Sequence, residues 1–314
     1  MPPAREFRRR IRSVKNTMQV TKAMELVSAA KLRRSQQKVL NARPYSTGMK
    51  GILERVSLAA REFSHPFFEA REGGKTCLVV VTSDKGLCGA YNTNVLKKAE
   101  EFLEECELEN TVLFLIGRKG FDYFRKRRWK IAGKHTEMRG RLDLRTVKKV
   151  TDELLHLYLS GEVNEIRLLY TSFISLLSRK VTLEKFLPIS PVGSEQRGRS
   201  IDGNKESPRE PHLTTAGPGP GKSEESREVL DYILEPSPEA IFESLLPRYA
   251  MTRIFIGLAE SFASENSARM IAMSAATKNA QEMIDYLTLI MNRLRQAAIT
   301  KEISEIVGGG ENLR

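Results

Sequence analysis

Two glycine-containing stretches have the residue types that could bind a nucleotide phosphate. Residues 83–92 (SDKGLCGAYN) follow a short apolar run, as a phosphate-binding turn would, but their glycines lack the GxGxxG spacing. Residues 216–223 (AGPGPGKS) fit a loose phosphate-loop pattern. However, no strand pattern precedes them, and Pro218 and Pro220 have no backbone N–H to donate to a phosphate. We therefore expect that the isolated chain does not bind or hydrolyse ATP.

The other reactive side chains are scattered along the chain. The four histidines form no triad and no metal-ligand spacing, and the three cysteines form no CxxC or zinc pattern. We interpret Cys77, Cys88 and Cys106 as reduced, structural thiols of a cytosolic protein. The sequence thus predicts no catalytic residue, no cofactor and no metal site. An enzyme that uses a nucleotide in a central α/β domain is an alternative, which nucleotide binding by the isolated chain would support.

The charge balance predicts an acidic partner. The net charge is +12, from 51 Lys and Arg against 39 Asp and Glu. Much of the excess lies in residues 1–40, where only Glu6 and Glu25 are acidic and the basic side chains form a track: Arg5, Arg8, Arg9, Arg10, Arg12, Lys15, Lys22, Lys31, Arg33, Arg34 and Lys38. A DNA-binding basic region would look similar, but it would carry interspersed base-reading Asn, Gln or aromatic groups, and we find no such set. We therefore favour an acidic protein surface as the partner and keep a basic coiled-coil nucleic-acid-binding protein as the alternative.

Neither a membrane span nor a targeting segment is predicted. No run of about eighteen apolar residues occurs. Residues 1–12 have no apolar signal-peptide core, and although they are Arg-rich we do not interpret them as a transit peptide.

The stretch from Ser237 to Val307 predicts one very long helix. Ser237 is an N-cap residue, Pro238 suits the first helical position, and Gly308–Gly310 is expected to end the helix. At ~1.5 Å per residue such a helix runs about 100 Å. A compact globule of this chain length would be only ~40–50 Å across, so the helix must leave its domain and needs a partner.

A heptad pattern identifies that partner as another helix. The expected seam consists of Ala276, Ala280, Met283, Leu287, Ile290, Leu294 and Ala297. Residues 4–64 are also helical in pattern, with an apolar stripe that slips in register: Phe7, Ile11, Val14 and Met18, then Val20, Met24 and Val27. Small residues near Ala29 and Ala275 occur in both helices. We therefore predict an antiparallel pair in which these small segments face each other. Pro44 should kink or interrupt the first helix, and His65-Pro66 should end it.

Residues 75–192 predict an α/β domain, because strand and helix patterns alternate. Strands are expected at 76–83, 111–116, 165–170 and 181–186, the last antiparallel to its neighbour, and helices at 92–107, through 123–127, and at 144–160.

Residues 193–226 are rich in Gly, Pro and Ser and predict a disordered insertion. Residues 227–236 would return to the domain, with a candidate edge strand at 230–234. The fold class is thus α/β: an antiparallel coiled coil of residues 1–64 and 237–314 plus a central Rossmann-like domain.

Several motifs in order resemble one family. These residues are 10–17 (RIRSVKNT), 21–31 (TKAMELVSAAK), 83–89 (SDKGLCG), 264–270 (SENSARM), 275–280 (AATKNA) and 292–300 (NRLRQAAIT). They look like the opening helix, the first turn of the α/β domain and the closing helix of the gamma subunit of F-type ATP synthases.

This resemblance implies a central rotor shaft, a non-catalytic subunit of a proton-translocating ATP synthase. It would couple rotation of the membrane c-ring to conformational change at the catalytic sites of the ring of alpha and beta subunits, and it would also contact the epsilon subunit. It implies no cofactor and no nucleic acid partner, and a place at the cytoplasmic face of the bacterial inner membrane, held only through partners. The residues expected to contact the beta subunit are Arg295, Gln296, Thr300, Lys85, Arg8, Arg12, Arg33 and Arg34.

Overall fold

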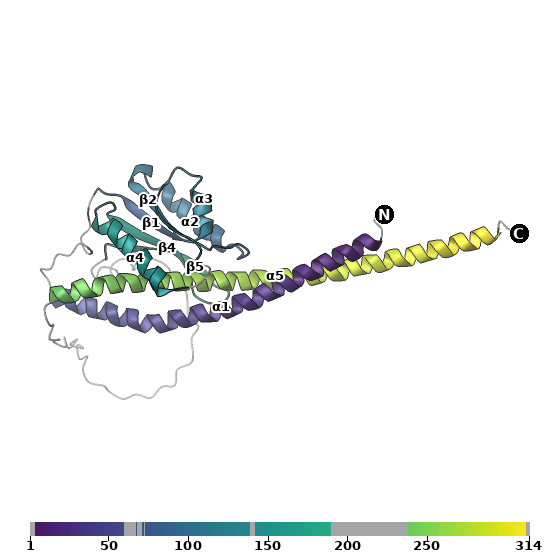
Figure 1. The fold of residues 1–314 in the computed structure, drawn as a ribbon, viewed down its shortest axis with the longest axis horizontal. Helices are drawn as coiled ribbons and strands as arrows, with labels where there is room; N and C mark the ends of the chain where they lie inside the picture. Colours follow the sequence, from purple (N-terminus) through teal and green to yellow (C-terminus); the bar gives the residue numbers. More distant parts are fainter. Residues whose placement is uncertain are drawn as a thin grey trace, which may run out of the picture.

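The chain is a long rod of two helices with an α/β domain on one side (Figure 1). The computed structural model describes residues 4–59, 67, 71, 73–138, 142–189 and 238–311. The expected insertion at 193–226, the return segment at 227–236 and the expected helix end at His65 and Pro66 lie outside these residues, as does the glycine-rich run at 216–223.

The rod consists of α1 (Ala4–Ala59) and α5 (Pro238–Glu311). Both chain ends lie at the same end of the rod in Figure 1, so the two helices run antiparallel. This confirms the predicted coiled coil of the terminal helices. The described helix α5 starts at Pro238, where the fixed φ of proline suits a first turn.

The seam of α1 differs from the predicted one, because there is no slip in register. Phe7, Ile11, Val14 and Met18 are half-buried, and the same four-three spacing continues as far as Leu53. It runs through half-buried positions and these buried ones: Thr21, Ser28, Leu32, Ser35, Val39, Met49 and Leu53. Val20 and Val27, which we expected in the seam, are 59% and 54% exposed. A straight helix cannot shift its seam by one residue without local over- or underwinding, so small polar residues stay in phase and the valines face outward.

The seam of α5 also needs a correction. Met283 is 53% exposed, whereas its neighbour Ile284 is 5% exposed and lies in the seam. Apolar residues occupy both positions, so periodicity alone could not show which one lies in the seam. Ile284 is the one buried because α1 lies on its side of α5. Ala297 is exposed because it lies where α5 has passed the end of α1.

The small-residue segments do not face each other. Thr21 contacts Thr277 across the rod, and counting from this pair places Ala29 about six residues, or ~9 Å, from the level of Ala275. Ala275 is itself exposed. The prediction that small residues mark the facing segments was therefore wrong, although the pairing of the helices was right.

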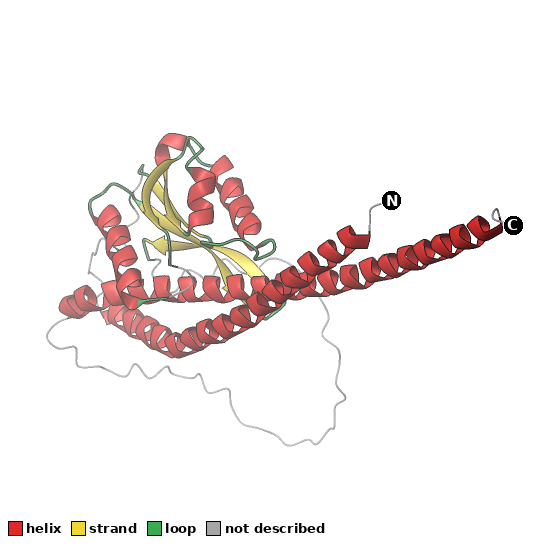
Figure 2. Cartoon of the chain, turned by 45° about the vertical axis from the view of Figure 1, so that its right-hand side comes forward, coloured by secondary structure: helices red, strands yellow, loops and turns green. Residues whose placement is uncertain are grey.

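Neither helix of the described rod is interrupted where we expected it, although a kink at Pro44 was the other expectation for α1. Helix α1 runs through Pro44 without interruption, and Figure 2 shows that α1 bends in its C-terminal half. Helix α5 includes Gly308–Gly310 and reaches Glu311. Glycine in a helix costs about 1 kcal/mol relative to alanine but creates no clash, so it need not end one.

The α/β domain contains a five-stranded sheet in the order β3-β2-β1-β4-β5. Its strands are β1 (Thr76–Val81), β2 (Thr111–Ile116), β3 (Lys130–His135), β4 (Glu165–Phe173) and β5 (Arg179–Leu187). The first four are mutually parallel and β5 is antiparallel to β4, as predicted. Strand β3 was not predicted. It is an edge strand that alternates exposed and half-buried residues and includes Gly133, so it lacks the continuous apolar run of its neighbours.

Helices cover both faces of the sheet (Figure 2). They are α2 (Tyr91–Glu104), α3 (Arg118–Phe124) and α4 (Leu144–Leu159), with a single 3-10 turn, η1 (Leu108–Asn110), before β2. Alternate residues of β1 enter two different cores. Cys77, Val79 and Val81 pack with α4 and the rod, whereas Leu78 and Val80 pack with α2 and α3. The sheet is thereby attached directly to the rod.

Candidate functional site

Three of the predicted contact residues lie on the end of α5 that extends past the described part of α1. Counting from the Thr21–Thr277 contact, the first described residue of α1 is level with about position 294 of α5. Arg295, Gln296 and Thr300 are exposed on the part of α5 that continues beyond it (Figure 1). Arg8 and Arg12 are exposed on α1 near the same end of the rod.

The remaining three predicted residues lie at the level of the α/β domain. Lys85, in the loop between β1 and α2, is exposed, and its carbonyl oxygen accepts a hydrogen bond from Arg269 of α5 at 3.1 Å. Arg33 and Arg34 are exposed within one turn of Lys31. Lys31 is near enough to Glu265 of α5 to lower the pKa of that carboxyl. The predicted residues therefore form two groups rather than one, and Arg295 of the first lies about 26 positions of α5, or ~39 Å, from Arg269, which contacts Lys85 of the second.

The loop that resembled a phosphate-binding turn binds protein groups instead. The Asp84 carboxylate accepts hydrogen bonds from the backbone N–H groups of Arg118, at the start of α3, and Glu137, at 3.1 and 3.0 Å. The Asn92 side chain bonds the backbone N–H and hydroxyl of Ser83. These contacts hold the loop in a fixed shape against α5 and α3.

A polar belt on α5 was missed by sequence reasoning. It comprises side chains that are buried where the helix passes the α/β domain: Glu260, Ser261, Ser264, Glu265, Ser267 and Arg269. Part of the stretch entered our reasoning only as a family motif. The available signal was the loss of the apolar stripe, because polar and small residues occupy all faces of the helix over these ten positions.

Two of the three charges of the belt, those of Glu265 and Arg269, are paired with each other. The carboxylate of Glu265 lies 2.7 Å from the guanidinium of Arg269, and their side chains are 8% and 10% exposed. Burial raises the pKa of Glu265, and the neighbouring Arg269 offsets part of that rise. The Tyr91 hydroxyl lies 2.6 Å from that of Ser261, and burial raises the pKa of Tyr91. The belt therefore serves packing and positioning.

The cysteines have the character of structural thiols. Burial raises the pKa of Cys77 to about 12 and also raises the pKa of Cys88, against hydrogen bonds that lower it. Both thiols stay protonated near neutral pH and are poor nucleophiles.

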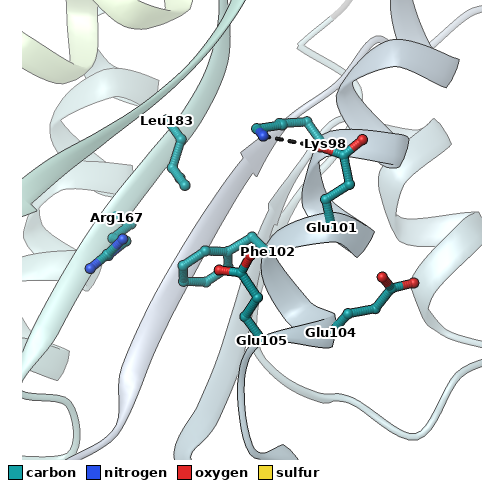
Figure 3. A pocket seen from close by; sticks show the side chains of 7 residues that line it. All are labelled: Lys98, Glu101, Phe102, Glu104, Glu105, Arg167 and Leu183. Carbon is teal, nitrogen blue, oxygen red and sulfur yellow. Dashed lines mark hydrogen bonds and ion pairs between the residues drawn. The ribbon is translucent and has the colours of Figure 1, made fainter.

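A shallow surface pocket lies between α2 and strands β4 and β5 (Figure 3). Lys98 pairs with Glu101 at 3.0 Å, and the guanidinium of Arg167 lies 5.2 Å from the ring centre of Phe102. The pocket is lined by Lys98, Glu101, Phe102, Glu104, Glu105, Arg167 and Leu183. In the described ranges, no three His, Cys, Asp or Glu side chains are grouped so that they could hold a metal ion. The same ranges contain no helix that is long and apolar enough to cross a membrane.

Comparison with known proteins gives matches along the whole described chain. A family model described as ATP synthase matches residues 3–313. The ATP synthase gamma chain of Pelotomaculum thermopropionicum is 42% identical over 313 residues, and that of Heliobacterium modesticaldum is 41% identical, each covering 100% of both chains.

Solved structures share the fold at much lower identity. A chain of the Euglena gracilis mitochondrial ATP synthase matches with a TM-score of 0.61 and 16% identity, covering 99% of this chain and 94% of that one. A central-stalk chain from the Tetrahymena thermophila mitochondrial enzyme matches with a TM-score of 0.56 and 20% identity, covering 82% and 99%.

Proposed function

The chain belongs to the gamma-chain family of ATP synthases, and from that premise we propose that the unaccompanied end of α5 transmits torque to the beta subunits through Arg295, Gln296 and Thr300. The subunit is non-catalytic and forms the central rotor stalk of the F-type enzyme, in a complex with the catalytic head and the c-ring. The observation that carries the proposal is the extension of α5 past the described part of α1, where these three side chains are exposed.

The rod is suited to couple rotation with catalysis because it is asymmetric. A two-helix rod inside a ring of three alpha and three beta subunits presents a different face to each of the three catalytic sites. The three sites, although identical in sequence, therefore hold different conformations. Turning the rod changes which site has which affinity, and binding free energy is linked reciprocally to rotation.

The basic track adds an electrostatic contribution to the same coupling. Arg8 and Arg12 near the rod end, and Arg33, Arg34 and Lys85 near the α/β domain, are exposed cations that would face acidic loops of the beta subunits. Because these charges are spread along the rod, the rod can pass between near-equivalent poses. The epsilon subunit and the c-ring would then bind the α/β domain and the end of the rod away from the chain termini. The subunit would stay at the cytoplasmic face of the bacterial inner membrane through these partners alone.

Arginine and glutamine at the rod end have complementary roles. Arg295 can donate two parallel hydrogen bonds to one carboxylate, and Gln296 extends the contact without adding charge. If the contact is desolvated, removing one partner costs about 2–5 kcal/mol.

The test is Arg295→Glu in a complex reconstituted with alpha and beta subunits. We expect weaker ATPase activity and less rotation under load, with unchanged helicity of the free subunit. The matched control is Arg128→Glu, the same charge reversal at an exposed arginine of the α/β domain. Equal activity of the two assembled variants would remove Arg295 from the path of torque.

A further inference from the structure

The rod is enclosed by protein along one segment of α5. Every residue from Leu258 to Arg269 is at least nine-tenths buried. One side of this segment packs on α1 and the other on the α/β domain. Elsewhere along the rod, outward-facing side chains such as Met283 and Tyr286 are exposed. This segment is therefore the main contact between the α/β domain and the rod.

The polar belt in this segment bonds to four different parts of the structure. Glu260 accepts a hydrogen bond from Ser172 of β4 at 2.7 Å and pairs with Arg43 of α1 at 3.2 Å. The hydroxyls of Ser261 and Tyr91, at the start of α2, are 2.6 Å apart.

The β4–β5 hairpin and the β1–α2 loop supply the remaining contacts. Ser264 and Ser267 donate to the carbonyl oxygens of Thr171 and Leu176, at 3.1 and 2.6 Å. Arg269 donates to the carbonyl oxygens of Lys85 and Gly86 at 3.1 and 3.2 Å.

These bonds are spread around the helix axis as well as along it. Successive residues of a helix are about 100° apart, so Ser267 and Arg269 point about 200° apart. The belt from Glu260 to Arg269 spans ~14 Å along the axis. A rotation of α5 relative to the domain would break bonds on both sides at once, and the buried groups would have no water to replace their partners.

We propose that the polar belt is a torsional lock that fixes the angle at which the α/β domain is held about the rod. Apolar side chains alone give attraction without direction, so a helix held only by them can turn to a neighbouring packing arrangement at low cost. Hydrogen bonds have narrow preferred geometry and hold one angle. The lock rests on the rotor function, because only a rotating shaft needs the domain and the rod to turn as one body.

The experiment removes hydrogen bonds while leaving the packing almost unchanged. The double variant Tyr91→Phe with Ser261→Ala deletes both partners of one bond, so no buried group is left unpaired. Ser267→Ala is a second variant at the hairpin. The matched control is Ser244→Ala on the same helix, because the hydroxyl of Ser244 donates only to the Ile241 carbonyl within α5.

The readout is the angular distribution of a probe on the half-buried thiol of Cys106 in the α/β domain, with the catalytic head fixed to a surface. During pauses between rotation steps, we expect the variance of the probe angle to be roughly two-fold higher in the double variant and in Ser267→Ala than in the wild type, because directional contacts are lost. The control should match the wild type. A wild-type chain that fails to assemble and rotate would refute the rotor function rather than the lock.

Circular dichroism of the free subunits separates loosening from unfolding. If the double variant melts at a lower temperature than the wild type, the angular distribution of Ser267→Ala alone tests the lock. Folded variants whose angular distributions are as narrow as that of Ser244→Ala would overturn the lock.

Discussion

The side-chain oxygens of Thr21 and Thr277 lie 2.8 Å apart across the rod and set the register of α1 against α5. Both residues belong to stretches that an apolar pattern would place outside the seam. If the contact persists in solution, the variant Thr21→Cys with Thr277→Cys should form a disulfide under mild oxidation, because two side chains at this separation suit disulfide geometry.

The control for that crosslink is Thr21→Cys with Thr288→Cys. Thr288 lies on the same helix about eleven positions further on, or ~16 Å away along the axis. A shifted mobility on a non-reducing gel is expected for the first pair only. Crosslinking of both pairs, or of neither, would contradict the register.

Two leucines of α1 test the absence of a slip in the seam. Leu32 is 3% exposed and Leu26 is 61% exposed. We expect Leu32→Ala to lower the free energy of unfolding by about 2–5 kcal/mol, through lost burial and the cavity left behind. Leu26→Ala should change it by no more than about 0.5 kcal/mol. Urea unfolding of the free subunit measures both, and equal effects would contradict a seam in which Leu32 is buried and Leu26 faces outward.

Two glycines should respond to alanine in opposite directions. Gly117 has a φ of +95°, and an added Cβ would lie 2.1 Å from the Thr82 carbonyl oxygen, so Gly117→Ala should destabilise by more than about 1 kcal/mol. Gly48 lies in α1 with nothing within 4 Å of an added Cβ, so Gly48→Ala should stabilise by about 0.5–1 kcal/mol. Melting temperatures of the two variants should therefore fall on either side of the wild-type value.

The buried carboxyl of Glu265 should make stability depend on pH. Burial raises its pKa above the unfolded value of 4.5, so the folded state holds this proton more tightly than the unfolded chain does. The resulting stability is present below pH 4.5 and is lost as the pH rises through the folded pKa. Glu265→Gln, which cannot titrate, should lose less stability than the wild type between pH 4.5 and pH 7.

The comparison needs a second carboxyl on the same helix. Glu282 has a side chain that is 65% exposed, so Glu282→Gln should keep the wild-type pH dependence. The measurement is the free energy of unfolding of the wild type, Glu265→Gln and Glu282→Gln between pH 4.5 and pH 7. A steeper loss in Glu265→Gln than in the wild type would reverse the sign of the argument.

Local pattern was enough to predict four of the five strands of the described sheet, the two long helices and their pairing. The strand at Thr111–Ile116 and the helix from Leu144 came from continuous apolar runs and helical periodicity, which are local properties of the chain. The need for a partner helix followed from length alone. Strand β3 was missed because an edge strand with polar alternate positions and a glycine has little local signal.

The sequence by itself determined which helices pair, and the tertiary structure decided how they face each other. Met283 and Ile284 are both apolar, and only the location of α1 makes Ile284 the buried one. Likewise, Ser261 and Ser267 are ordinary helix residues until Tyr91 and the Leu176 carbonyl are brought to them from other parts of the chain. Hydrophobic periodicity records how much surface must be buried, whereas register and polar bonding depend on the positions of groups far apart in the sequence.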